Sequence, residues 1–309
     1  MSGPSQHESP PQWIRELPSL PPWTKDRPAV PWNLCGMLRA WNEYPLAMDF
    51  LDPRSSNFHY KALQTRLYRE RLAPLFESTP QPKRILDAAC GIGRLLIPLA
   101  EQGHQVVGVD ACEPSLRAAQ RHIKGATGDG RIPKDRTPTL HWDDVADLNC
   151  LAGQARFDLV LALELLCYLD EPGRIASKLA QHLKPGGHLV VSVEAWPGAL
   201  LCDPEAIREP EQLSRALEEG ILAVPEDRWL QAVDARELES ILQCSGLDVL
   251  WIEGTHFLPD GPLAACLDLE RLTDPSYVDA VVALEQRCSK DKRLRMLPRA
   301  LLAVARKPG

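Results

Sequence analysis

The sequence has 309 residues, with 35 Lys and Arg against 42 Asp and Glu, and a net charge of −7. This length can bury a full core, and the acidic balance argues against a dedicated nucleic-acid-binding protein, which would carry a basic surface. Neither an apolar signal segment nor a run of about 18 apolar residues occurs, which predicts a cytoplasmic protein without a membrane partner. Nine scattered cysteines form no CxxC pair, so we expect reduced thiols and no metal site.

The first 58 residues differ in composition from the rest. Prolines punctuate residues 1–32, which favours an extended arm over a long helix. Trp13, Trp23 and Trp32 lie among these prolines, and disordered tails are usually poor in aromatic residues. We therefore expect the last part of the arm to pack on the body of the protein. Helical spacing follows at 34–50 and 59–76, so residues 1–58 are predicted to form an arm and lid and residues 59–309 the main domain.

From residue 84 onward, strand patterns alternate with helix patterns, which predicts an α/β fold with a mostly parallel, doubly wound sheet. A turn signal, Lys184 to Gly187, separates a helix from the next strand. Asp234 and Glu237 predict a capping box at the start of another helix, which ends at Gly246. The strands are predicted at 84–88, 105–110, 139–142, 157–163, 187–193, 247–253 and 300–305, and the intervening helices at about 94–102, 114–123 and 172–183.

Two stretches are longer than the connections of such a sheet require. They are residues 195–233 and 254–299, and both follow strand ends on the side where open α/β sheets bind ligands. With the N-terminal arm they are predicted to form a helical lid over a substrate. The alternative is that they are packing extensions without ligand contact.

Residues 85–97, ILDAACGIGRLLI, carry the most informative motif. An apolar strand ends in Asp87, a small-residue turn contains Gly91 and Gly93, and a helix follows. Such a turn lets a ligand approach the backbone, and the helix start offers free N–H groups, so the segment predicts a nucleotide-like cofactor site. A dinucleotide-binding fingerprint would need a third glycine where Leu96 stands, and no Gly-Lys-Ser/Thr of a P-loop follows.

Four blocks in order resemble the class I S-adenosylmethionine-dependent methyltransferases of the small-molecule type. DAACGIG is similar to motif I, although Ala89 stands where the first glycine is usual. QVVGVDACEPSL resembles motif II, FDLVLALELLCYL resembles motif IV, and LKPGGHLVVSVE resembles the fifth strand and its turn. The resemblance implies a Rossmann-like seven-stranded sheet with an antiparallel last strand, and S-adenosyl-L-methionine as the cofactor.

The resemblance also implies which residues hold this cofactor. Asp87 would hold the turn or a water near the amino-acid end, and Asp110 would accept hydrogen bonds from both ribose hydroxyls. Asp144 would accept from the adenine amino group, although the adjacent Asp143 competes for this role, and backbone carbonyls near Ala162 would meet the ammonium. The expected cofactor-binding set is Asp87, Ala89, Gly91, Gly93, Asp110, Ala111, Asp144, Val145 and Ala162.

Candidate catalytic residues follow the strand ends. Glu164, after the fourth strand, could be a general base or could neutralise positive charge, and His256, after the sixth, is a second base candidate. Glu194 and His59 are weaker candidates for the same role. Three aromatic residues could cover the sulfonium or the substrate by cation–π contact, or could be lid core: Tyr44, Tyr60 and Trp196. A basic run favours a solvated helix face over a site for an anionic substrate: Lys290, Lys292, Arg293 and Arg295.

The sequence therefore predicts methyl transfer from S-adenosylmethionine to an O, N or C atom of a small-molecule acceptor, in secondary metabolism. Such a reaction mainly needs alignment of the acceptor with the methyl group and exclusion of water, so no metal is expected. Two alternatives stay open. One is a nicotinamide-dependent oxidoreductase, because Asp110 would suit any ribose, and the other is a non-catalytic cofactor-binding partner subunit.

Overall fold

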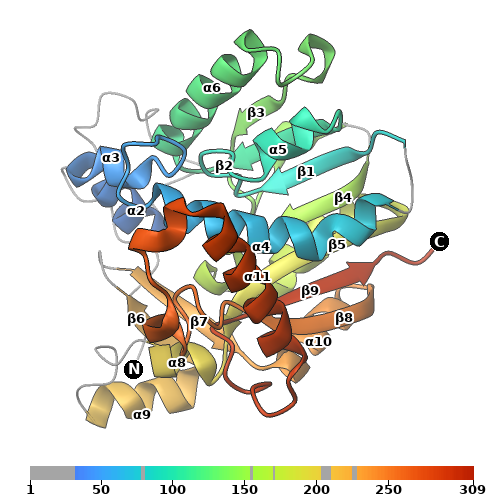
Figure 1. Ribbon diagram of the computed structural model, residues 1–309. Helices are drawn as coiled ribbons and strands as arrows, with labels where there is room; N and C mark the ends of the chain where they lie inside the picture. Colours follow the sequence, from blue (N-terminus) through green and yellow to red (C-terminus); the bar gives the residue numbers. More distant parts are fainter. Residues whose placement is uncertain (1–31, 78–80, 154–155, 170, 203–209, 225–227) are drawn as a thin grey trace.

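The computed structural model describes residues 32–77, 81–153, 156–169, 171–202, 210–224 and 228–309. The expected extended arm, with Trp13 and Trp23, lies outside these residues. A central sheet covered by helices on both faces forms the body of the described chain (Figure 1). No helix in these ranges is long and apolar enough to cross a bilayer.

Five parallel strands and an antiparallel pair form the predicted doubly wound sheet. Its order is β3-β2-β1-β4-β5, and β9 then pairs antiparallel with both β5 and β8. The antiparallel last strand is therefore confirmed. The strands are β1 (Arg84–Ala88), β2 (Gln105–Asp110), β3 (Thr139–Trp142), β4 (Phe157–Ala162), β5 (Leu183–Ala195), β8 (Asp248–Thr255) and β9 (Ala300–Arg306).

Helices cover both faces because successive side chains of a strand point to opposite sides. Ile85 and Leu159 are buried with one set of helices, α4 (Phe58–Glu77), α5 (Leu96–Glu101) and α6 (Glu113–Gly128). Leu86 and Val160 are buried with the other set, α7 (Pro172–Gln181) and α10 (Ala235–Cys244). The predicted capping box is present at the start of α10, where the Asp234 side chain accepts from the backbone N–H of Glu237 at 2.9 Å.

Two element boundaries differ from the sequence-based prediction. The helix predicted over 34–50 is split into α2 (Trp32–Glu43) and α3 (Pro45–Met48). Pro45 has no backbone N–H to donate within a continuing helix, so it stands at the first position of a new one. The predicted turn at Lys184 to Gly187 lies inside β5. There the register with β4 shifts between Phe157 and Leu159, so the extra residues form a bulge rather than a separate turn.

The two long stretches contain regular structure that the sequence did not predict. Residues 195–233 include α8 (Gly198–Cys202), α9 (Pro210–Glu219) and the hairpin of β6 (Ile221–Val224) and β7 (Arg228–Val233). Strand β7 pairs with the end of β5, Glu194 opposite Ala232, and so extends the sheet beyond its seven predicted strands. Residues 254–299 include α11 (Pro275–Lys290), which packs beside α4 through a shared apolar cluster (Figure 1).

Candidate active site

The turn after β1 leaves its backbone open to a ligand. Ala89, Gly91 and Gly93 all have positive φ, at 62°, 53° and 87°. Glycine adopts this left-handed conformation readily, whereas alanine does so only at a cost. No heavy atom lies within 4 Å of the point where a Gly91 side chain would begin. A ligand can therefore lie directly against this turn.

Asp110 ties the end of β2 to the same turn. Its carboxylate accepts hydrogen bonds from the backbone N–H of Gly91 and of Cys112, each at 2.7 Å. Burial raises the pKa of Asp110 to about 6, although these two N–H groups oppose the shift. Burial, with the nearby charge of Asp110, raises the pKa of Asp87 to about 7. A positively charged ligand or hydroxyl donors would stabilise both carboxylates in their ionised form.

The loop after β3 separates the roles of its two adjacent acids. Asp143 is buried and uses both carboxylate oxygens locally, accepting from the N–H of Asp144 at 2.9 Å and of Cys150 at 2.8 Å. Asp144 accepts from the N–H of Ala146 at 2.9 Å, and Val145 between them is buried. This arrangement favours Asp144 over Asp143 as the acid that contacts an adenine.

The residues at this end of the site fit S-adenosylmethionine. The open Gly91 backbone suits a close cofactor approach, and Asp110 presents a buried carboxylate where a ribose would lie. Ala111 follows Asp110, and its carbonyl accepts a hydrogen bond from the exposed Trp142 indole at 2.9 Å. Ala162, fully buried, ends β4, which lies on the other side of β1 from β2. The roles of the individual residues remain predictions.

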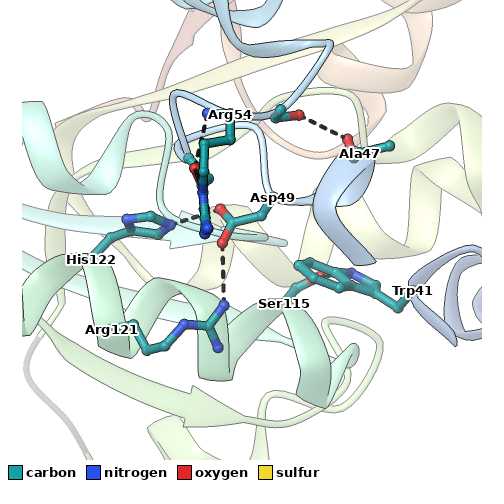
Figure 2. Close-up of polar contacts among 9 residues, drawn as sticks. Trp41, Ala47, Asp49, Arg54, Ser115, Arg121 and His122 are labelled. Carbon is teal, nitrogen blue, oxygen red and sulfur yellow. Dashed lines mark hydrogen bonds and ion pairs between the residues drawn. The ribbon is translucent and has the colours of Figure 1, made fainter. Parts of the chain in front are cut away.

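The N-terminal segment covers this end of the site. Figure 2 shows Trp41 of α2 reaching Ser115 of α6, where its indole N–H donates to the Ser115 hydroxyl at 2.8 Å. Asp49, after α3, contacts His122 at 2.7 Å and Arg121 at 3.2 Å, both on α6 (Figure 2). A buried apolar cluster joins α2 to the turn and α6: Leu38, Trp41, Ile92, Cys112 and Ala118. These contacts support the predicted lid role of residues 32–58.

One ion pair joins the turn to a neighbouring cavity. Arg94, directly after Gly93, donates to the Glu164 carboxylate at 3.2 Å. The Arg94 guanidinium also lies 6.0 Å from the centre of the Phe50 ring in the N-terminal segment. The turn, the end of β4 and the lid therefore meet at Arg94.

The cavity itself has a volume of about 100 Å³ and lies at the carboxyl ends of β4 and β5. Helix α4 and the loop after β8 close it from the other sides. Its lining is dominated by polar and charged side chains: Lys61, Gln64, Glu164, Glu194, His256, Asp260 and Arg299. Ligands in open α/β sheets bind at this edge, so the cavity is the candidate acceptor site.

Glu164 is a poor proton acceptor in this environment. Burial alone would raise the pKa of Glu164, but the positive charges of Arg94 and Lys61 and the hydrogen bond from Arg94 lower it to about 2. A carboxyl group with such a pKa stays ionised at neutral pH. The structure therefore disfavours the expected general-base role and fits the second role considered, neutralisation of positive charge.

His256 is a neutral side chain with an unpartnered ring nitrogen. Its imidazole is 4% exposed, and burial lowers its pKa to about 4, so it is neutral near pH 7. Its Nε2 atom is buried and has no hydrogen-bond partner in the described chain. Glu285 of α11 holds the adjacent backbone, because its carboxylate accepts from the N–H groups of Phe257 at 2.8 Å and Leu258 at 3.0 Å.

The other base candidates are less suited. Burial raises the pKa of Glu194 to about 7, but Arg299 pairs with its carboxylate at 3.1 Å. His59 is exposed on α4 and does not line the cavity. The Lys61 ammonium lies 5.9 Å from the centre of the Tyr60 ring. Tyr44 is exposed, and Trp196 packs in a separate apolar cluster. The basic run is exposed but does not form a helix face, because α11 ends at Lys290 and the other three residues lie in the turns that follow: Lys292, Arg293 and Arg295.

Backbone strain gathers at these two places. Five non-glycine residues of the described chain have positive φ, and four belong to the site: Ala89 at the turn, and Glu164, His256 and Asp260 at the cavity. Such conformations cost free energy and persist where the surrounding structure imposes them, often at functional sites. At the cavity, the surrounding structure therefore holds Glu164, His256 and Asp260 in backbone conformations that place their side chains in its lining.

Several cavity residues were not predicted from the sequence. On α4, Lys61, Gln64 and Tyr68 recur at helical spacing and so share one face, which was an available signal. Asp260 and Arg299 offered no local signal, because the residues that they contact in the cavity are distant in the sequence. No cluster of three or more His, Cys, Asp or Glu able to hold a metal occurs among the described residues.

Comparisons with known proteins agree with this geometry. A family model described as a methyltransferase domain matches residues 60–251. The chain is 37% identical over 121 residues to the ubiquinone biosynthesis O-methyltransferase of Idiomarina loihiensis, covering 37% of this chain and 45% of that one. It is 30% identical over 177 residues to the enzyme of the same name from Leptothrix cholodnii, covering 57% and 68%.

A solved structure has the same fold. Magnesium protoporphyrin IX methyltransferase from Synechocystis PCC 6803, with bound S-adenosylhomocysteine, superposes with a TM-score of 0.56 at 16% sequence identity. The match covers 88% of this chain and 98% of that one. The similarity extends over the sheet and its helices, whereas the matched sequence of the first relative spans less than half of that protein.

Proposed function

The chain belongs to the class I S-adenosylmethionine-dependent methyltransferases, and from this premise we propose that it methylates an oxygen atom of a small molecule held in the polar cavity. Membership in the family makes the chain an enzyme that uses S-adenosylmethionine, and sets aside the nicotinamide-dependent and non-catalytic alternatives. The observation that supports the acceptor site is the convergence of Glu164, His256 and Asp260, all strained, on one cavity beside the cofactor turn.

The residues of the turn and the neighbouring strands would hold the cofactor. Asp110 would bind the ribose, Asp144 and Val145 the adenine, and the backbone of Gly91 and Gly93 would lie against the cofactor. When bound, S-adenosylmethionine supplies an electrophilic methyl group on a positively charged sulfur. Arg94 and the ionised Glu164 would fix the boundary between this site and the cavity, since they form an ion pair across it.

His256 would be the proton acceptor. An alcohol or phenol oxygen becomes a better nucleophile as it loses its proton, and a neutral imidazole beside it can take that proton. The acceptor oxygen would take up the methyl group that the bound cofactor would supply, with the electron pair of the broken bond left on the cofactor, and the hydroxyl proton would pass to His256. The two relatives from Idiomarina loihiensis and Leptothrix cholodnii are named as O-methyltransferases, which supports oxygen as the acceptor atom.

Water exclusion would come from the elements that cover the site. The N-terminal segment packs over the turn through Trp41 and Asp49, and α11 holds the loop of His256 through Glu285. Alignment of the two reactants in a closed site can supply much of the rate enhancement in such a reaction. These contacts support a lid role for the N-terminal segment within the proposed function.

Two measurements test the proposal together. Calorimetric titration should show micromolar binding of S-adenosylhomocysteine and no binding of NADH. Incubation with S-adenosylmethionine and a panel of phenols, catechols, amines and thiols should yield products that gain one methyl group on oxygen, identified by mass spectrometry and by the methoxy resonance in NMR. Methylation of amines or thiols alone would contradict the assignment of oxygen.

A further inference from the structure

The charged and polar groups of the cavity form ion pairs or hydrogen bonds with one another, with three exceptions. Glu164 pairs with Arg94, Glu194 pairs with Arg299 at 3.1 Å, and Asp260 accepts from the Gln64 side-chain amide at 2.8 Å. What remains toward the cavity is the Lys61 ammonium, the Gln64 carbonyl oxygen and the His256 Nε2 atom. The last two are buried polar atoms without a partner in the described chain.

Lys61 is a cation without an anionic partner. Its ammonium lies 5.4 Å from the centre of the Phe50 ring and 5.9 Å from that of Tyr60, and no ion pair of the described residues includes it. Burial lowers the pKa of Lys61, although the charges of Glu164 and Asp260 oppose the shift. A half-buried cation without a close anion gains from a ligand that brings one.

The two unpartnered acceptor atoms require a donor from the ligand. Gln64 is 2% exposed, and its amide nitrogen is already bonded to Asp260, so its oxygen cannot turn away without losing that bond. His256 is held by a strained backbone, and Gly261 packs so closely that a side chain there would meet the His256 carbonyl at 2.1 Å. Both acceptors are therefore fixed in place, and a ligand hydroxyl, which has one proton, can donate to one of them.

The size of the cavity limits the ligand. About 100 Å³ is somewhat less than an engineered protein cavity of about 150 Å³ that accepts benzene. The part of the ligand that enters the cavity can therefore be no larger than about a single unsubstituted ring. The polar lining also disfavours an apolar chain, because each buried charge would lose its compensation.

Given the proposed function, on which this inference rests, we propose that the acceptor is a compact hydroxy acid, whose carboxylate pairs with Lys61 and whose hydroxyl donates its proton to His256 Nε2. The carboxylate anchors the molecule at α4, and the hydroxyl is presented to the base and to the cofactor side of the cavity. The carboxylate itself is not methylated, because its oxygens are held by the ammonium.

The test uses binding to protein saturated with S-adenosylhomocysteine, so that turnover is not needed. The probes are the three hydroxybenzoate isomers and lactate, each compared with its neutral amide of nearly the same shape. Isothermal titration should show the acids bound about 10- to 100-fold more tightly than the amides, the range expected for a charged hydrogen bond. Lys61→Met should remove this preference while the affinity for S-adenosylhomocysteine and the thermal unfolding midpoint stay unchanged.

Lys124→Met, on the exposed side of α6, is the matched control and should bind the acids as the unaltered protein does. Amides that bind as tightly as acids, a Lys61→Met protein that keeps the preference, or a panel in which no acid binds would each overturn the inference. Loss of S-adenosylhomocysteine binding by the unaltered protein would instead contradict the proposed function. The two failures are therefore distinguishable in the same titrations.

Discussion

The cofactor end and the acceptor end of the site adjoin at Arg94, but the chain builds them differently. The cofactor end consists of short contiguous segments at the ends of β1 and β2 and in the loop after β3. The acceptor cavity joins α4, β4, β5 and the loop after β8, so that Gln64 and Asp260, bonded at 2.8 Å, lie 196 residues apart in the chain. Contiguous segments produce recognisable motifs, whereas distant contacts do not.

The two ends also differ in charge. At the cofactor end, Asp87 and Asp110 are buried acids with raised pKa values, and no basic side chain forms an ion pair with either of them in the described chain. At the acceptor end, Glu164 and Glu194 each pair with an arginine. A cationic cofactor is therefore suited to the first end. Among the described residues, the second end leaves one cation without an ion pair, Lys61, and two neutral polar atoms without a partner, on Gln64 and His256.

The largest expected effect lies at the acceptor end. His256→Gln should lower kcat by about 10²–10⁴-fold, the usual contribution of a general base, while the affinity for S-adenosylhomocysteine stays unchanged. Because burial lowers the pKa of His256 to about 4, the imidazole is unprotonated above about pH 5, and its contribution should disappear only as the pH falls through about 4. Initial rates and calorimetric titrations measure the two quantities.

His59→Gln is the matched control, since this histidine is exposed on α4, and it should keep full turnover. The pKa of the His256 imidazole also responds to four nearby charges: Glu164, Asp260, Lys61 and Arg94. A step in activity near neutral pH would instead point to Glu194, because burial raises its pKa to about 7. Glu194→Gln should abolish such a step. Equal turnover of His256→Gln and the unaltered enzyme would remove His256 from the chemistry.

The next largest effect lies at the cofactor end. Asp110→Ala should weaken binding of S-adenosylhomocysteine by about 1.5–3 kcal/mol, roughly 10- to 150-fold, because it removes a charged hydrogen-bond acceptor. It should also lower the unfolding midpoint, since the Gly91 and Cys112 N–H groups lose their partner. Asp248→Ala, an exposed acid at the start of β8, is the control. Unchanged affinity would exclude Asp110 from the ribose site.

A third effect depends on pH. Asp87 and Asp110 have pKa values raised to about 7 and about 6, and a bound cation and hydroxyl donors would lower both, so binding should release protons. Cofactor affinity should therefore rise with pH between about 5 and 7, by up to about tenfold per pH unit for each proton released. The cofactor's α-amino group stays protonated in this range.

Titrations in buffers of different ionisation enthalpy count the released protons directly. Asp87→Asn should reduce the count, because the amide cannot titrate. Affinity that is constant across this range would show that neither carboxylate changes its protonation on binding. Binding of hydroxybenzoates to the acceptor end should lack the contribution of Asp87 and Asp110.

The difference between the two ends explains what the sequence could predict. Strand and helix periodicity placed the seven core strands, and glycines with a preceding acid identified the cofactor turn, because both depend on residues close in the chain. The hairpin β6–β7 was not predicted, since β7 is fixed by pairing with β5 rather than by its own pattern. Lys61 and Arg299 became site residues only when the fold brought α4 to the ends of β4 and β5.

Local sequence located one residue correctly but left its role open. Glu164 was predicted at the end of β4, where it lies, but its pKa depends on Arg94 and Lys61 from other segments. His256 was one candidate among several, and only its burial and unpartnered Nε2 atom distinguish it from the exposed His59. Charge environment is a property of the assembled site, so acid–base roles could not be assigned from the motif.

The smallest expected effect concerns the one departure from the motif. Ala89 has φ of 62°, a conformation that costs a non-glycine residue about 1–2 kcal/mol. Ala89→Gly removes this strain, but glycine also loses more conformational entropy on folding, by about 0.4–1 kcal/mol. The free energy of unfolding should therefore rise by about 1 kcal/mol or less. Ala88→Gly, in ordinary strand conformation next to it, should instead lower it.

Cofactor affinity of Ala89→Gly distinguishes two roles for the alanine methyl group. If the methyl group only strains the turn, affinity should stay within a few-fold of the unaltered protein, since the Gly91 and Asp110 contacts remain. A tenfold loss would show that the methyl group contacts the cofactor and that the departure from glycine is functional. Thermal unfolding and titration with S-adenosylhomocysteine on the same two variants separate strain in the turn from contact with the cofactor.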